Sequence, residues 1–173
     1  MISNTRITAL AATAAVALTA LAISACGGGG GSSSTERPTT ADGKPATIGL
    51  ESEGSLGDIL VNSQGRSLYL FQRDRGTTSE CTGACAAAWP PLRATGTPVV
   101  GTDLSASKLG TTPRSDGKPQ VTYNGHPLYL YSADQKPGDT NGQGLNAFGG
   151  AWFALSAAGN MVSGQGTGSG SGY

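Results

Sequence analysis

One seven-residue stretch occurs twice in this chain, sixty positions apart. Residues 68–74 read Leu-Tyr-Leu-Phe-Gln-Arg-Asp and residues 128–134 read Leu-Tyr-Leu-Tyr-Ser-Ala-Asp. Because side chains alternate along a β-strand, the two leucines of each copy face one side and the two aromatic residues face the other. Both faces are therefore apolar, which is typical of a strand covered on two sides. The repeat predicts that these aromatic residues are core, not an exposed aromatic cage.

The correspondence between the copies extends beyond this stretch. Gln-Gly-Arg-Ser precedes the first copy where Asn-Gly-His-Pro precedes the second, Asp74 corresponds to Asp134, and Trp89 corresponds to Trp152. The Asp spacing is 60 and the Trp spacing is 63, so three extra residues fall after the second Asp. Two hairpin-plus-strand units, each with an uncovered apolar face, are expected to pack on one another.

Turn signals place strands around the repeats. The expected strands are rich in aliphatic and aromatic residues and lie at residues 59–61, 68–71, 121–123, 128–131 and 152–155. Asn-Ser-Gln-Gly joins the first two, the strong hairpin signal Asn124–Gly125 joins the next two, and the last turns at Ala-Ala-Gly-Asn into Met161. Pro127 lacks an amide hydrogen and is expected where the ladder faces outward or is bulged.

Helix signals are weak. Residues 86–88 are three alanines, and residues 103–110 fit one or two helical turns with Asp103 as the N-cap and Gly110 as the stop. The predicted fold class is therefore all-β (mainly β): one compact, sandwich-like or barrel-like domain of two pseudo-symmetric repeats, with at most short helical turns.

The first 25 residues have the layout of an export signal, with Arg6 followed by an uncharged apolar run. The run ends in Ile-Ser-Ala-Cys, which resembles a bacterial lipobox, so Cys26 is the expected lipidation site. A single-pass helix is the alternative, but a run of roughly 17 apolar or small residues is short and weakly hydrophobic for that. Diacylglyceryl and palmitate chains on Cys26 would anchor the protein to the extracytoplasmic face of the cell membrane.

Composition then divides the chain. We expect a signal peptide at residues 1–25, a lipidated cysteine and Gly/Ser/Thr/Pro tether at 26–47, the duplicated domain at 48–163 with repeats at about 56–100 and 118–162, and a Gly/Ser tail at 164–173. The whole chain has 11 basic and 11 acidic residues, and removing the signal takes away one basic residue. This balance indicates no nucleic-acid partner.

The other two cysteines are four positions apart, at Cys81 and Cys85. In an exported protein a disulfide is the default state for such a pair. With Gly83 between them, the two Cα atoms can reach the roughly 4.4–6.8 Å separation that a disulfide requires. A ring this small stabilises a fold by only about 2 kcal/mol in the loop-closure model, so it should hold a local turn.

These features together resemble a known family of exported bacterial lipoproteins, described as a secreted repeat of unknown function, with a repeated motif of Tyr, any residue, aromatic, two of any residue, and Asp. The motif residues here are Tyr69, Phe71, Asp74, Tyr129, Tyr131 and Asp134. The Cys-Cys-Trp-Pro segment around Trp89 and the Gly-Ala-Trp-Phe segment around Trp152 add to the likeness, which covers about residues 50–160. The resemblance implies location and repeat structure, and it carries no settled activity.

Both motif aspartates end a strand and precede a loop rich in small and polar residues. An aspartate in this position commonly accepts backbone amide hydrogen bonds and shapes the turn, and we favour that role over ligand binding. As a catalytic pair, Asp74 and Asp134 have no evident partner in the sequence.

A metal site would need Cys81, Cys85 and His126, with Asp74 completing a tetrahedral set. Oxidised cysteines cannot ligate, and a copper carrier is expected to offer Met or several His residues, whereas the mature chain has one of each. We therefore expect no metal and no other cofactor. His126 follows the Asn-Gly turn and is expected to face solvent without a task.

Catalysis also finds little support in the sequence. No Gly-x-Ser-x-Gly elbow lies on a strand-to-helix turn, and a single His argues against a hydrolase, so we do not expect an enzyme. The preferred hypothesis is a lipid-anchored, non-enzymatic envelope module that binds an unknown envelope protein or small ligand. The alternative is a redox, metal or electron-transfer accessory that uses Cys81 and Cys85 or an aromatic-lined site. No basic residue adjoins the cysteines to stabilise a thiolate, which favours the first hypothesis.

Overall fold

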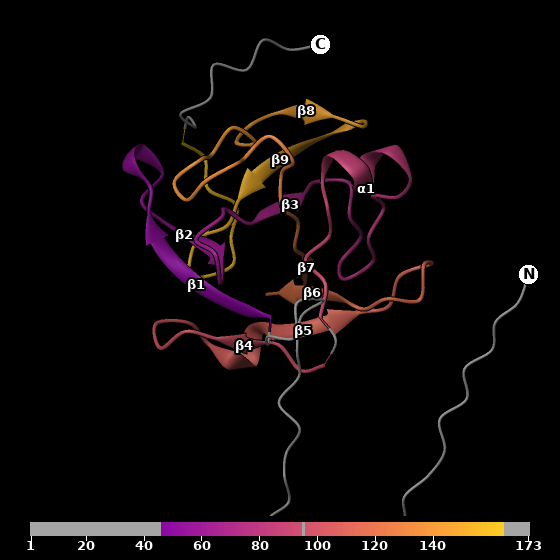
Figure 1. Ribbon diagram of the computed structural model, residues 1–173, viewed down its shortest axis with the longest axis horizontal. Coiled ribbons are helices and arrows are strands. Elements are labelled where there is room, and N and C mark those ends of the chain that lie inside the picture. The colour runs from indigo at the N-terminus through magenta and orange to yellow at the C-terminus, as the bar shows by residue number, and fades with distance from the viewer. Residues whose placement is uncertain (1–45, 95, 165–173) are drawn as a thin grey trace, which may run out of the picture. The chain divides into compact units, whose positions relative to one another are not determined.

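A computed structural model describes residues 46–94 and 96–164, and the statements below concern these residues (Figure 1). The expected signal peptide, Cys26, nearly all of the expected tether and all but the first residue of the expected tail lie outside them. No helix in the described ranges is long and apolar enough to cross a membrane.

Short strands form three small sheets, each of three strands, in the described part of the chain. The first sheet has the order β2 (Asp58–Asn62), β1 (Thr47–Ser52), β4 (Val99–Val100); the second β3 (Tyr69–Phe71), β9 (Gly150–Ala154), β8 (Asn146–Ala147); and the third β5 (Leu109–Thr112), β6 (Gln120–Tyr123), β7 (His126–Pro127). Neighbouring strands are antiparallel except β1 and β4, which are parallel. The fold is mainly β, as predicted, and the sheets do not close into a barrel.

Helical structure is confined to three short segments of the described residues. They are the α-helix α1 (Ala84–Ala88), which covers the three predicted alanines, and the 3₁₀ turns Gly54–Leu56 and Ala106–Lys108. This agrees with the prediction of no long helix.

All three predicted hairpins form. In the first, Asn62 N donates to Arg66 O and Leu68 N donates to Leu60 O (both 2.9 Å). In the second, Asn124 and Gly125 have φ values of 50° and 82°, the left-handed pair that a tight two-residue turn requires. The third closes with Ser156 N donating to Asn160 O (2.9 Å).

Two details of the predicted elements are wrong. Asp103 does not cap a helix, because the 3₁₀ turn begins only at Ala106 and Gly110 lies inside β5, where it pairs with Thr122 of β6. Pairing with β6 gives this segment more hydrogen bonds than one isolated helical turn would. Residues 128–131 also do not form a continuous strand. Tyr129 makes only isolated bridges, to Tyr69 and to Pro91, and neither pairing extends into a longer ladder.

The core has two faces, as the alternation in the repeat predicts. Leu68, Leu70 and Leu128 lie in one buried cluster with residues from β1, β2 and β6. Tyr69, Phe71 and Tyr129 lie in another with both tryptophans and the two cysteines. Each repeat segment therefore separates a leucine-rich cluster from an aromatic cluster.

Candidate functional site

The two repeats meet at equivalent residues. Tyr69 N donates to Tyr129 O (2.9 Å), and Tyr129 N donates to Tyr69 O (3.0 Å). This reciprocal pair is the antiparallel arrangement expected of two copies related by an approximate two-fold axis. The two repeats therefore contact each other through equivalent tyrosines, Tyr69 and Tyr129.

The side chains of these tyrosines cross between the repeats. Tyr69 OH donates to Asp134 Oδ2 (2.6 Å), and Tyr129 OH donates to Asp74 Oδ2 (2.9 Å). Each copy supplies a hydroxyl group to the carboxylate of the other copy. All four residues could be identified from the sequence, whereas this crossing could not.

The remaining oxygen of each aspartate orders the loop that follows it. Asp74 Oδ1 accepts from Glu80 N (2.8 Å), and Asp134 Oδ1 accepts from Asn141 N (3.0 Å) and Asn141 Nδ2 (3.1 Å). The aspartates thus make the loop-shaping contacts expected of them, and each also binds a tyrosine of the opposite copy.

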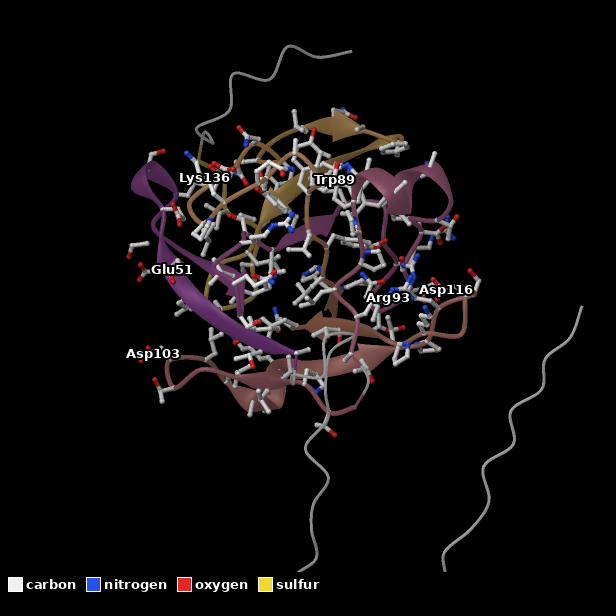
Figure 2. The ribbon with its side chains drawn as sticks, viewed as in Figure 1. Glu51, Trp89, Arg93, Asp103, Asp116 and Lys136 are labelled. Carbon is white, nitrogen blue, oxygen red and sulfur yellow. A yellow bond between two sulfur atoms is a disulfide. The ribbon has the colours of Figure 1, made fainter. Side chains whose placement is uncertain are left out.

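The aromatic rings of the two repeats interleave in one stack. Ring centroids are 4.0 Å apart between Phe71 and Trp152, 3.9 Å between Trp152 and Trp89, and 4.2 Å between Trp89 and Tyr131. Successive rings therefore come from alternate copies. The first tryptophan, labelled in Figure 2, directly follows α1. Near-parallel ring pairs of this kind add to the stabilisation from burial.

Two further ring contacts meet this stack edge-on. Tyr69 contacts Trp89 at 5.4 Å and Tyr129 contacts Trp152 at 5.1 Å, both nearly perpendicular. Both tyrosines and both tryptophans are at most 1% exposed. Of the four motif aromatic residues, Tyr131 is partly exposed and the others are buried. The motif aromatic residues therefore pack against one another in the interior, and Phe71 and Asp74 also reach the wall of a small pocket.

Burial dominates the electrostatics of the two Tyr–Asp pairs. It raises the pKa of Asp74 from 3.8 to about 6, against the opposing effect of hydrogen bonds from Glu80 N and Tyr129 OH. Burial also raises the pKa of Asp134. The pKa values of Tyr69 and Tyr129 are raised by burial and then by the neighbouring carboxylates, so both hydroxyls remain protonated donors at neutral pH.

The raised pKa of Asp74 predicts a pH effect on stability. Between about pH 4 and 6 the folded protein holds this proton more tightly than the unfolded chain, so Asp74 adds stability at low pH that is lost as the pH rises through about 6. Urea unfolding of the wild type and of Asp74→Asn at pH 4, 5, 6 and 7 measures this contribution. We expect the difference to move in favour of the wild type as the pH falls; a difference that is constant, or that moves the other way, contradicts the prediction.

A buried arginine that was not predicted from the sequence lies beside the Tyr129–Asp74 pair. The Arg114 side chain is 3% exposed, and its guanidinium donates to Gln120 Oε1 and Cys81 O (both 2.7 Å) and to Ser79 Oγ. Ser79 Oγ in turn lies 2.7 Å from Tyr129 OH. Nothing in the local sequence signals this role, because Arg114 stands in a polar loop and two of its partners, Ser79 and Cys81, are 35 and 33 positions away.

The predicted disulfide is present. Cys81 and Cys85 are bonded with a Cα–Cα distance of 5.3 Å, at the start of α1. The two residues are 0% and 7% exposed. Since both sulfurs are bonded, the metal-ligand set of Cys81, Cys85, His126 and Asp74 does not exist in this structure. In the described residues, no three or more His, Cys, Asp or Glu side chains are grouped so that they could hold a metal ion.

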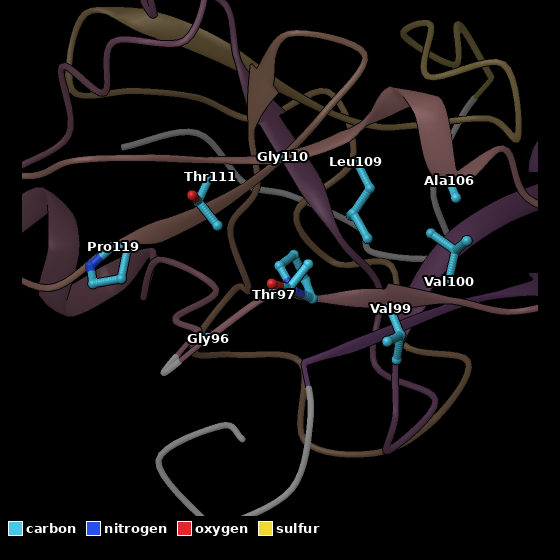
Figure 3. Close-up of a pocket in the computed structure, with 10 residues that line it drawn as sticks. Gly96, Thr97, Val99, Val100, Ala106, Leu109, Gly110, Thr111 and Pro119 are labelled. Atoms are coloured by element: carbon cyan, nitrogen blue, oxygen red, sulfur yellow. The ribbon is translucent and has the colours of Figure 1, made fainter. Parts of the chain in front are cut away.

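An apolar groove of about 700 Å³ lies between β4 and β5. Figure 3 shows Val99, Val100 and Leu109 around it, and the segment with Thr97 and Pro98 and the residue Pro119 complete much of its wall. No charged side chain is among the lining residues. The groove was not predicted from the sequence, because its two walls come from β4 and β5, which were not predicted either.

A smaller pocket of about 290 Å³ is lined by His126, Met161, Asp74, Gln72 and three further residues. His126 is half-buried at this pocket, so the expectation that it faces solvent is wrong in part. The reason is that residues from the other copy and from the third hairpin close around the Asn-Gly turn.

A family profile described as a secreted repeat of unknown function matches residues 52–93 and 110–156, in agreement with two repeats. No curated protein and no solved structure matches the chain.

Proposed function

Since this chain belongs to the family described as a secreted repeat of unknown function, and is therefore an exported protein, we propose that it is a lipid-anchored, non-enzymatic module of the cell envelope. In this proposal Cys26 carries the lipid, and the duplicated domain presents a binding surface to an envelope protein or a small ligand. Biochemical activity does not reside in the repeated motif.

One observation carries the non-enzymatic assignment: the motif residues satisfy one another. Each motif aspartate accepts a hydrogen bond from a buried tyrosine of the opposite copy and from a backbone amide. A general acid or base must instead reach a substrate proton directly or through one water. The pattern supports an architectural role for these residues.

The groove between β4 and β5 is the surface that best fits ligand binding. Binding pockets for small molecules are typically apolar clefts of about 300–1,000 Å³ with a few polar groups. The groove has a volume of about 700 Å³ and an uncharged lining that includes Val99, Val100 and Leu109. An uncharged, largely apolar ligand or segment of a partner therefore fits it better than a charged metabolite.

The redox alternative finds less support. A dithiol that cycles must be reached by an attacking thiolate. Cys81 is fully buried, Cys85 is nearly so, and the carbonyl of Cys81 is held by Arg114. These contacts fit a structural disulfide.

Lipid attachment at Cys26 is tested by metabolic labelling of the full-length chain with an alkyne analogue of palmitate. We expect the wild type to take up the label and to sediment with membranes, because two acyl chains give stable anchoring. Cys26→Ala should lose the label and leave the membrane fraction. The control, Cys81→Ser with Cys85→Ser, should keep both. Full labelling of Cys26→Ala, or an unlabelled wild type, would exclude the anchor.

A further inference from the structure

The chain contains one histidine, and its methionines are Met1 and Met161. His126 and Met161 line the same pocket, although they are 35 positions apart in the sequence. Their proximity follows from two touching turns, because Asn124 Nδ2 donates to Gly159 O (3.4 Å). His126 stands two positions after Asn124, and Met161 stands two positions after Gly159. Lys108 Nζ donates to Ala158 O (2.7 Å) and further fixes the second turn.

Neither side chain is committed to a strong contact. Within the described ranges, the imidazole of His126 has no hydrogen-bond or ion-pair partner, and burial alone lowers its pKa. Imidazole binds metals in its neutral form, and an ordinary histidine is largely neutral above about pH 6.5. The Met161 side chain is 44% exposed, and its sulfur accepts one long contact from Gln72 Nε2 (3.5 Å).

Metal preference follows from the chemistry of these donors. A thioether is a soft ligand that selects Cu(I), and imidazole also binds copper well. Hard ions such as Mg²⁺ and Ca²⁺ prefer oxygen ligands. The carboxylate of Asp74 lies at the same pocket and supplies negative charge beside a bound cation. From this juxtaposition we propose that His126 and Met161 form a binding site for Cu(I).

This site is independent of the groove and of the lipid anchor. Its two ligands come from the hairpin of β6 and β7 and from the residues after β9, outside the aromatic stack. Copper binding therefore requires no opening of the core. No redox step is part of the proposal, because the site is inferred to hold Cu(I) and not to change its oxidation state.

The first test is a competition titration of the whole mature chain, purified in detergent, with Cu(I) under anaerobic conditions against the chelator bicinchoninate. We expect one Cu(I) per chain. His126→Gln and Met161→Leu should each weaken binding at least tenfold, and the double variant should reduce it to background. Phe148→Leu, which changes another exposed large apolar side chain, should bind as the wild type does. Equal binding by the wild type and the double variant overturns the proposal.

The second test identifies the ligands directly and also checks folding. Ag(I) mimics Cu(I) without a reductant, so the disulfide stays intact, as mass spectrometry can verify. With methyl-labelled methionine, NMR should show the Met161 methyl signal and the His126 ring signals shifting together at one equivalent of Ag(I). The spectra of the variants, with their remaining signals unchanged, confirm that they are folded. If Ag(I) saturates the protein and neither the Met161 nor the His126 signals shift, the ion binds elsewhere and the proposal is wrong.

Discussion

Replacing Trp152 by alanine is expected to lower the free energy of unfolding by about 3–5 kcal/mol, the usual cost of removing a large buried aromatic side chain. Trp152 is fully buried, and its ring lies between those of Phe71 and Trp89 at 4.0 and 3.9 Å. Its Nε1 also donates to Ala147 O (3.2 Å). Because a domain is stable by only about 5–15 kcal/mol, this variant should be close to unfolding at physiological temperature. Urea denaturation followed by circular dichroism measures the loss.

Two control variants separate loss of the stack from loss of any aromatic ring. Trp152→Phe keeps a ring in the stack and should cost less than the alanine variant. Phe148→Ala removes an aromatic side chain that is 43% exposed in the β8–β9 turn, and it should change stability by about 0.5 kcal/mol or less. If Trp152→Ala lowers the free energy of unfolding no more than Phe148→Ala does, the aromatic stack does not stabilise the fold as predicted.

The burial of the motif aromatic residues could be predicted because it depends only on a local periodicity. Alternation along residues 68–71 assigns leucines and aromatic rings to opposite faces whatever the rest of the chain does. The hairpin at Asn124–Gly125 was equally predictable, since both residues adopt the positive φ values that this dipeptide tolerates well. These features belong to segments of a few residues and need no knowledge of distant contacts.

The features that the sequence could not supply are set by long-range packing. Tyr69 is five residues from Asp74 and 65 from Asp134, yet it binds the distant one. The choice follows from the antiparallel pairing of Tyr69 with Tyr129, which no local pattern specifies. The proximity of His126 and Met161 has the same origin. A mature chain with one histidine and one methionine did not indicate a copper site from sequence alone. The fold places both residues at one pocket.

The predicted helical turns at residues 103–110 are confirmed only at Ala106–Lys108, and the wrong ends, Asp103 and Gly110, have a related cause. An aspartate followed by small residues and a glycine fits a helical turn, but propensity is a weak guide when an alternative partner exists. Here β6 provides that partner, and Leu109 and Gly110 pair with Tyr123 and Thr122. The same segment then supplies one wall of the apolar groove.

Because each motif tyrosine binds the aspartate of the opposite copy, the two tyrosines should contribute differently to stability. Tyr69→Phe should cost about 1.5–3 kcal/mol, the usual value for a hydrogen bond to a charged group, because Asp134 is 1% exposed and its Oδ2 would lose its donor. Tyr129→Phe should cost less, since Asp74 is only partly buried.

Double-mutant cycles at neutral pH then identify the partner of Tyr69. Tyr69→Phe combined with Asp134→Asn should show a coupling energy above about 0.5 kcal/mol, because the two side chains are in direct contact. Tyr69→Phe combined with Asp74→Asn should be additive within about 0.5 kcal/mol, although these two residues belong to the same copy of the motif. Coupling within a copy and additivity between copies would mean that each repeat forms its own Tyr–Asp pair. The domain would then be two adjacent units, whereas the crossed pairs make each repeat dependent on the other for its buried carboxylate.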